Sequence, residues 1–176
     1  MNPATVWITG LPAAGKTTLA DAVAGILGRA GAPVEVFDGD ALRRGPSRGL
    51  GFSREDRATQ AARVAGLATE VVEAGGFAVV ALVSPYREDR KAVRLAHADN
   101  GLAFCEVWMD TPLAECETRD PKGLYARARA GELSGLTGVD APYEPPENAE
   151  VVIGPDSTPD QGARAVVSAL GFNLSA

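Results

Sequence analysis

Residues 10–17 read Gly10-Leu11-Pro12-Ala13-Ala14-Gly15-Lys16-Thr17, between a short apolar run and a helical one. The spacing fits G-x-x-x-x-G-K-[ST], the pattern of a loop that wraps backbone N–H groups around phosphates. The following helix would add unsatisfied N–H groups and the positive end of its dipole. Lys16 would reach the β- and γ-phosphates of ATP, and Thr17 would ligate Mg²⁺. The residues expected to contact ATP are Gly10, Ala13, Ala14, Gly15, Lys16, Thr17 and Thr18.

The rest of the chain alternates apolar runs with helical stretches. The expected strands are 5–9, 34–37, 77–84, 104–109 and 150–153. The expected helices are 16–29, 54–74, 87–98, 112–118 and 159–170, with a shorter one near 122–130. This alternation predicts an α/β fold of three layers, in which helices flank a five-stranded parallel sheet. Together with residues 10–17 it predicts a P-loop NTPase/kinase fold, with residues 1–176 forming a single domain.

Polar residues and glycine lie at or just after the ends of these strands: Gly10, Asp38, Ser84 and Thr111. Right-handed crossovers place the carboxyl ends of parallel strands along one edge, where ligands bind. Residues 119–146 have no strand pattern and are rich in glycine, proline and basic side chains. We therefore expect one site at this edge, with 119–146 as a mobile lid over it.

An acidic pair, Asp38-Gly39-Asp40, follows the second expected strand. One carboxylate can accept a proton from an attacking hydroxyl, and the other can hold the metal or its waters. Asp-Gly-Asp is also a common turn, so the pair is informative only because it lies beside the phosphate loop. Arg43, Arg44 and Arg48 come next, and arginine suits phosphate or sulfate oxygens. For Arg44 and Arg48 we expect only a solvated loop.

Composition narrows the classes of partner. The net charge is −6 and 45% of the residues are hydrophobic, as in an ordinary globular protein with no general affinity for nucleic acid polymers or membranes. No apolar stretch reaches the ~18 residues of a spanning helix, and no secretion signal is visible, so a cytoplasmic location is expected. Cys105 and Cys116 are expected to be buried and reduced. His97 is expected on a surface helix without a role.

Further motifs accompany the acidic pair in a fixed order. They are Leu50-Gly51-Phe52-Ser53, Asp56-Arg57, Ser84-Pro85-Tyr86-Arg87, Thr111-Pro112-Leu113, Lys122-Gly123-Leu124-Tyr125 and Thr137-Gly138. In this order and spacing the chain resembles the adenylylsulfate kinases, which phosphorylate the ribose 3′-hydroxyl of adenosine 5′-phosphosulfate. The resemblance runs from the phosphate loop to about Ile153.

The resemblance implies roles for particular side chains. Asp38 and Asp40 would polarise the acceptor hydroxyl, and Phe52 would stack on the acceptor base. Ser84 matches a serine described in this family as a phosphorylated intermediate. We favour direct in-line transfer, because phosphoryl transfer mainly needs positioning and charge stabilisation, and Ser84 would then line the acceptor pocket. The implied catalytic residues are Lys16, Asp38, Asp40, Ser84 and Lys122.

The resemblance also implies ligand contacts and a homodimer. Arg43 and Arg57 would hold the phosphosulfate, Lys122 would reach the phosphates from the lid, and Arg119 would contact ATP. The implied acceptor-binding residues are Asp38, Arg43, Phe52, Arg57, Gln60, Val83, Ser84, Lys122 and Leu136.

Departures from the family pattern cluster on the acceptor side. They are Ala41 for asparagine, Gly49 for aspartate, Thr59-Gln60 for Glu-Asn, Ala62 for arginine, and Leu136 for the second phenylalanine that sandwiches adenine. Simple divergence is one interpretation. Another is a kinase for a different nucleoside 5′-anhydride, for example a cytidine diphosphate derivative, and a third is a non-catalytic nucleotide-binding regulator. A shikimate or gluconate type of kinase would not need Phe52 or the segment 84–86.

Overall fold

The computed structural model describes residues 2–45 and 47–172. Its sheet has five parallel strands in the order β2-β3-β1-β4-β5. The strands are β1 (Ala4–Thr9), β2 (Val34–Asp38), β3 (Phe77–Ala81), β4 (Ala103–Met109) and β5 (Val151–Ile153). The helices are α1 (Lys16–Arg29), α2 (Gly39–Arg44), α3 (Arg54–Glu73), α4 (Arg87–Asp99), α5 (Leu113–Arg119), α6 (Leu124–Arg129) and α7 (Pro159–Ala169). The predicted α/β architecture is confirmed.

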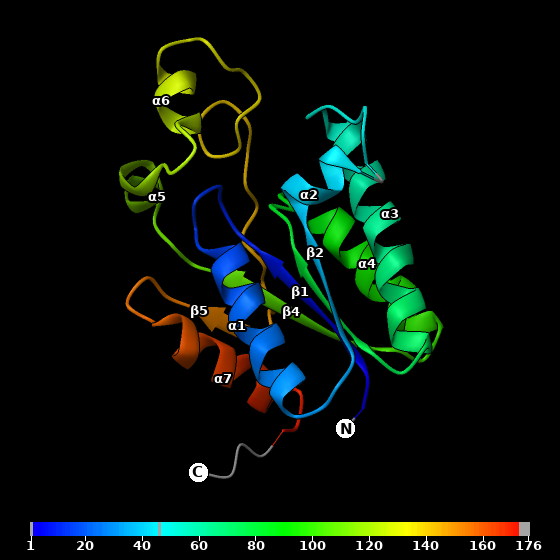
Figure 1. Ribbon diagram of the computed structural model, residues 1–176. Helices are drawn as coiled ribbons and strands as arrows, with labels where there is room; N and C mark the ends of the chain where they lie inside the picture. Colours follow the sequence, from blue (N-terminus) through cyan, green and yellow to red (C-terminus); the bar gives the residue numbers. More distant parts are fainter. Residues whose placement is uncertain (1, 46, 173–176) are drawn as a thin grey trace.

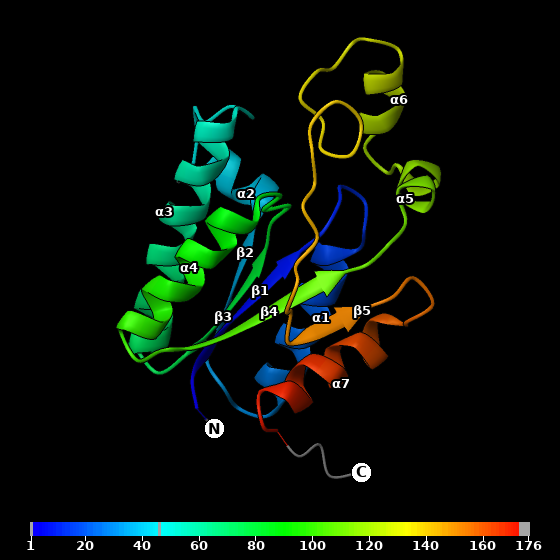
Figure 2. The same ribbon diagram turned by 180° about the vertical axis from the view of Figure 1, so that it is seen from behind.

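Helices cover both faces of the sheet. Figures 1 and 2 show α1 and α7 on one face and α3 and α4 on the other. Successive residues of a strand point to opposite faces, so Val6 and Ile8 pack under α1 and α7 while Trp7 packs under α3 and α4. Both layers are apolar, which is why β1 and β3 are buried along their whole length.

The strand order gathers the chain's chemistry at one edge. β1 lies between β3 and β4, so the segments that follow these three strands leave the sheet side by side. The lid segment rises above this edge as α6 and a long loop, beside α5 (Figure 2). A site at this edge is therefore covered by the lid on one side and bordered by α2 and the start of α3 on the other (Figure 1).

The structure differs from the sequence prediction at three places. β3 ends at Ala81 rather than at residue 84, and Ser84 itself takes a left-handed conformation, with φ of 42°, that is incompatible with a strand. The six-residue helix α2 occupies a stretch predicted as a loop. His97 is fully buried, not on the surface, and its ring bonds the Thr5 hydroxyl at 2.9 Å.

Two further expectations concern burial and membranes. Cys105 and Cys116 are free and buried, as predicted. Within the described ranges, no helix combines the length and the apolar character needed to cross a bilayer.

Candidate active site

The loop between β1 and α1 has the backbone that its glycines predict. Gly10 and Gly15 adopt positive φ angles of 154° and 100°. A Cβ at Gly10 would come within 2.9 Å of the Met109 Cβ, so only glycine allows the loop to lie this close to β4. Gly10 thus shapes the loop instead of lining the cavity described below.

Lys16 opens α1 and points back over its own loop. Its Nζ donates to the Gly10 carbonyl at 3.0 Å and to the Leu11 carbonyl at 2.7 Å. Burial lowers the pKa of Lys16 to about 8, although the nearby carboxylates Asp38 and Asp40 act to raise it. The ammonium group is thus poorly solvated, and phosphate oxygens would be better partners for it than carbonyls are.

Thr17 and Asp38 join the phosphate loop to the acidic pair. The Thr17 hydroxyl donates to Asp38 Oδ2 at 2.7 Å, and Asp38 Oδ1 accepts the backbone N–H groups of Asp40 and Ala41. Asp38 is therefore the N-cap of α2. Partial burial alone would raise the pKa of Asp38, but these three hydrogen bonds and the Lys122 charge lower it below its usual value. The carboxylate is thus fixed in place and ionised.

The oxygens of Thr17 and Asp38 fit a Mg²⁺ ion that is held mainly by nucleotide phosphates and water. Magnesium prefers oxygen ligands and keeps several waters. Across residues 2–45 and 47–172, no group of three or more His, Cys, Asp or Glu side chains is arranged to bind a metal by itself. The donor set is thus that of a metal–nucleotide site and not of a closed protein cage.

Asp40 points to the lid. It forms an ion pair with Lys122, which lies just before α6. Both side chains are more than half exposed. The pair links the acidic segment after β2 to a residue more than 80 positions away, and so brings the lid over the phosphate loop.

One cavity of about 890 Å³ unites these elements. Of the residues expected to bind ATP or the acceptor, it is lined by Ala13, Gly15, Lys16, Thr17, Thr18, Asp38, Asp40, Arg43, Phe52, Arg57, Gln60, Val83, Ser84, Arg119, Lys122 and Leu136. Ala14 lies beneath it, and its carbonyl accepts bonds from Thr111 Oγ1 at 3.1 Å and Arg119 at 3.5 Å.

At the far end of the cavity, Phe52 is 56% exposed and is flanked by two arginines. The Arg43 guanidinium lies 4.2 Å from the centre of the Phe52 ring, and that of Arg57 lies 5.6 Å from it. Arg57 also donates to the carbonyls of Phe52 and Gly135, which ties α3 to the lid loop.

Arg43 forms more hydrogen bonds within the protein than its predicted role as a ligand contact suggested. It donates to the carbonyls of Leu50 and Gly51 and to Gln60 Oε1 at 2.5 Å. These contacts use three of the five N–H donors of a guanidinium, which leaves two for a ligand. The bond from Arg43 to Gln60 also orients the Gln60 side chain. Its amide oxygen accepts that bond, and its amide nitrogen has no hydrogen-bond partner among the residues that the structure describes.

Among the described residues, five buried side-chain polar atoms have no hydrogen-bond partner. Three of the five, Gln60 Nε2, Ser84 Oγ and Thr137 Oγ1, belong to residues that line this cavity. Buried polar atoms are rarely left unpaired without a reason, and ligand recognition is such a reason.

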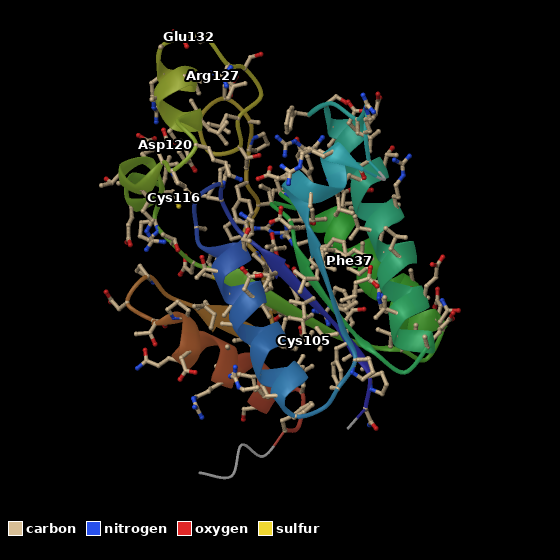
Figure 3. All side chains as sticks on the ribbon, in the orientation of Figure 1. Phe37, Cys105, Cys116, Asp120, Arg127 and Glu132 are labelled. Carbon is tan, nitrogen blue, oxygen red and sulfur yellow. The ribbon has the colours of Figure 1, made fainter. Side chains whose placement is uncertain are left out.

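Some cavity residues were given no role in the sequence analysis. Tyr125 is 2% exposed and donates its hydroxyl to the Pro12 carbonyl at 3.0 Å, which fastens α6 to the phosphate loop. Arg127 lines the cavity from α6, near the tip of the lid (Figure 3). Arg127 could have been identified from the sequence, because it is a basic residue only five positions after Lys122 in the same lid segment.

Comparison with known proteins agrees with this geometry. The family model described as adenylylsulphate kinase matches residues 2–154. The chain belongs to the adenylylsulphate kinase family. Its relatives in that family include the adenylyl-sulfate kinase of Gloeothece citriformis, 48% identical over 147 residues that make up 84% of this chain and 81% of the relative.

A second relative in the family is longer. The bifunctional enzyme CysN/CysC of Mycobacterium tuberculosis is 45% identical over 166 residues, which is 94% of this chain but 27% of that enzyme. The solved structure of the M. tuberculosis APS kinase CysC in complex with AMPPNP and APS is 44% identical. It superposes with a TM-score of 0.94 over 97% of this chain and 99% of that one.

Proposed function

We propose that this chain transfers the γ-phosphoryl group of ATP to the 3′-hydroxyl of adenosine 5′-phosphosulfate, giving 3′-phosphoadenosine 5′-phosphosulfate. The observation that carries the proposal is the continuity of one cavity from the phosphate loop to Phe52 and Gln60. In-line phosphoryl transfer needs donor and acceptor held end to end in such a space. The relatives named adenylyl-sulfate kinase support the choice of substrates.

The acidic pair lines the cavity, with Asp38 bonded to Thr17 of the phosphate loop. As the acceptor oxygen bonds to the γ-phosphorus and the bridge to the β-phosphate breaks, one of these carboxylates accepts the hydroxyl proton. Asp38 is fixed by α2 and Thr17, whereas Asp40 is exposed beside the lid. Lys16 and Lys122 neutralise charge on the phosphates, and a Mg²⁺ ion held through Thr17 would supply further positive charge there.

The acceptor end has donors and apolar surface suited to a nucleotide 5′-anhydride. The free N–H groups of Arg43 and Arg57 and the unpaired Gln60 amide nitrogen suit anionic oxygens. Phe52 offers an exposed ring for the base. Ser84 is 8% exposed in the wall of this end, a place consistent with direct transfer to the acceptor.

A second candidate acceptor is another nucleoside 5′-anhydride, such as a cytidine diphosphate derivative. The observation that favours it is Leu136, which presents an aliphatic side chain where the family has a second aromatic ring to enclose adenine. The third interpretation, a non-catalytic regulator, has no support, because the side chains for catalysis lie together in the cavity and the relatives are kinases. One kinase domain over 1–176, a homodimer and a cytoplasmic location stay predictions.

The test is a kinase assay with adenosine 5′-phosphosulfate and with cytidine and uridine 5′-diphosphate analogues at matched concentrations. The phosphorylated position is read by ³¹P NMR. Lys16→Ala should lose transfer and keep its fold, and Asp38→Asn should lower turnover much more than ATP affinity. Preference for a pyrimidine compound would replace the acceptor but not the kinase assignment. Full activity of Lys16→Ala would refute the assignment itself.

A further inference from the structure

The turn that follows β3 is held in an unusual conformation. Ser84 has φ of 42°, and non-glycine residues persist in this region only where their surroundings fix them. Its carbonyl accepts a hydrogen bond from Arg90 at 2.6 Å and a longer one from Thr9 Oγ1 at 3.2 Å. The Val83 carbonyl accepts from the same Thr9 hydroxyl at 2.7 Å. Val83 and Ser84 both line the cavity, so these bonds shape its wall.

Arg90 is the centre of this arrangement. It lies on α4, is 3% exposed and does not line the cavity. Besides the Ser84 carbonyl, its guanidinium donates to Glu106 Oε1 at 2.8 Å and to the Glu144 carbonyl at 2.6 Å. One rigid fork thus joins three segments: β4, the turn after β3, and the end of the lid.

The end of the lid is fastened to the same turn by further bonds. The Glu144 N–H donates to the Pro85 carbonyl at 2.8 Å, and the Tyr143 hydroxyl lies 3.1 Å from Thr9 Oγ1. Burial raises the pKa of Tyr143 to about 12, so this hydroxyl keeps its proton at neutral pH. Residues 143–144 are therefore bound to β1 and to the cavity wall, whereas the tip of the lid stands away from the sheet (Figure 2).

We propose that Arg90 is a positioning residue that fixes the Ser84 turn and the end of the lid as one unit, so that lid movement and the acceptor wall are coupled. The inference rests on the proposed function and deepens it. Arg90 acts through two carbonyls and touches neither nucleotide. Its loss should therefore misplace the acceptor, while the phosphate loop, which bonds the same turn only through the long Gly10 N–H to Val83 carbonyl contact of 3.5 Å and is held by Lys16, should keep its affinity for ATP.

Arg90→Lys is the informative substitution, because lysine keeps the charge opposite Glu106 but cannot serve three acceptors in a fixed plane. Arg94→Lys is the matched control. Arg94 lies one turn further along α4 and also bonds Glu106, at 3.2 Å, but its other partner is Glu150. A general effect of weakening this ion-pair network would appear in both variants.

The expected result for Arg90→Lys is a ten- to hundredfold loss of kcat/KM for the acceptor, about the effect of a small misplacement. Its Kd for ATP should stay within about twofold, and Arg94→Lys should change neither constant by more than that. Hydrogen exchange of 84–87 and 143–145 should rise together in Arg90→Lys. Equal losses in both variants, a parallel loss of ATP affinity, or faster exchange in only one segment would overturn the proposal.

Two provisions keep the test decisive. If Arg90→Lys does not fold, Tyr143→Phe removes only the hydroxyl that meets Thr9. It should show the same split between acceptor and ATP, and unchanged acceptor kinetics would contradict the coupling. If the wild-type chain phosphorylates none of the nucleotides tested, the proposed function fails, but the exchange measurement still decides whether the two segments move together.

Discussion

Truncation of Phe52 is the sharpest test of the acceptor site. Because the side chain is 56% exposed, Phe52→Ala should hardly change the free energy of unfolding. Stacking of one base on an aromatic ring contributes about 1–3 kcal/mol. That range corresponds to a rise of about 5- to 150-fold in the KM for adenosine 5′-phosphosulfate. Arg43 should keep its place, because three hydrogen bonds to other residues hold it.

The assay measures the KM for the acceptor, the Kd for ATP and the melting temperature of each variant. Leu95→Ala is the matched control, since Leu95 is 51% exposed on α4 and does not line the cavity. Only Phe52→Ala should raise the acceptor KM, and neither variant should change the Kd for ATP. An acceptor KM within twofold of wild type in Phe52→Ala would refute the stacking role. An equal rise in both variants would show that the effect is not local.

Three other outcomes are expected. Without a ligand the pKa of Lys16 is about 8, and bound phosphate would raise it. The affinity for ATP should therefore be constant below pH 8 and fall above pH 8, where binding is accompanied by the uptake of a proton. Calorimetry should show this uptake in the wild type but not in Lys16→Arg, which stays charged. Leu136→Phe should lower the KM for adenosine 5′-phosphosulfate severalfold by adding a ring, whereas a raised KM would favour a remodelled base pocket. Arg127→Ala should raise the KM for one of the two nucleotides, ATP or the acceptor, about tenfold, which is the effect of losing one charge-assisted hydrogen bond. Arg129→Ala should not, because Arg129 pairs with Glu117 outside the cavity.

Strong local patterns allowed much of the fold to be predicted. The phosphate loop needs particular glycines at particular spacings, and buried strands need unbroken apolar runs, so both are visible in one sequence. The helix α2 was missed because its six residues are too few to show an amphipathic period. His97 was misplaced although its spacing from Arg90 and Val93 puts all three on the buried face of α4.

The residues expected to contact the nucleotides could be predicted from the sequence, but the residues that hold them in position could not. Spacing indicates that Lys16, Asp38 and Lys122 meet, because each follows or covers a strand end. Nothing local reveals that Arg90 bonds Glu106 and the Glu144 carbonyl, since those partners are 16 and 54 residues away. Nor does it show that Arg43 uses most of its donors on nearby carbonyls. Polar groups that are distant in the sequence become partners only once the chain is folded, so local sequence patterns do not reveal these pairs.

The ion pair between Asp40 and Lys122 has a consequence for turnover and for salt. In the structure, Lys122 is already paired with Asp40. Phosphates that enter the site therefore replace Asp40 as the partner of Lys122, and they do not meet an unpaired cation. Exposed pairs of this kind contribute no more than about 1 kcal/mol. The exchange therefore costs little in either direction, and the lid can release product as readily as it accepts substrate. Nucleotide affinity should accordingly depend on ionic strength less steeply than the number of basic residues around the cavity suggests.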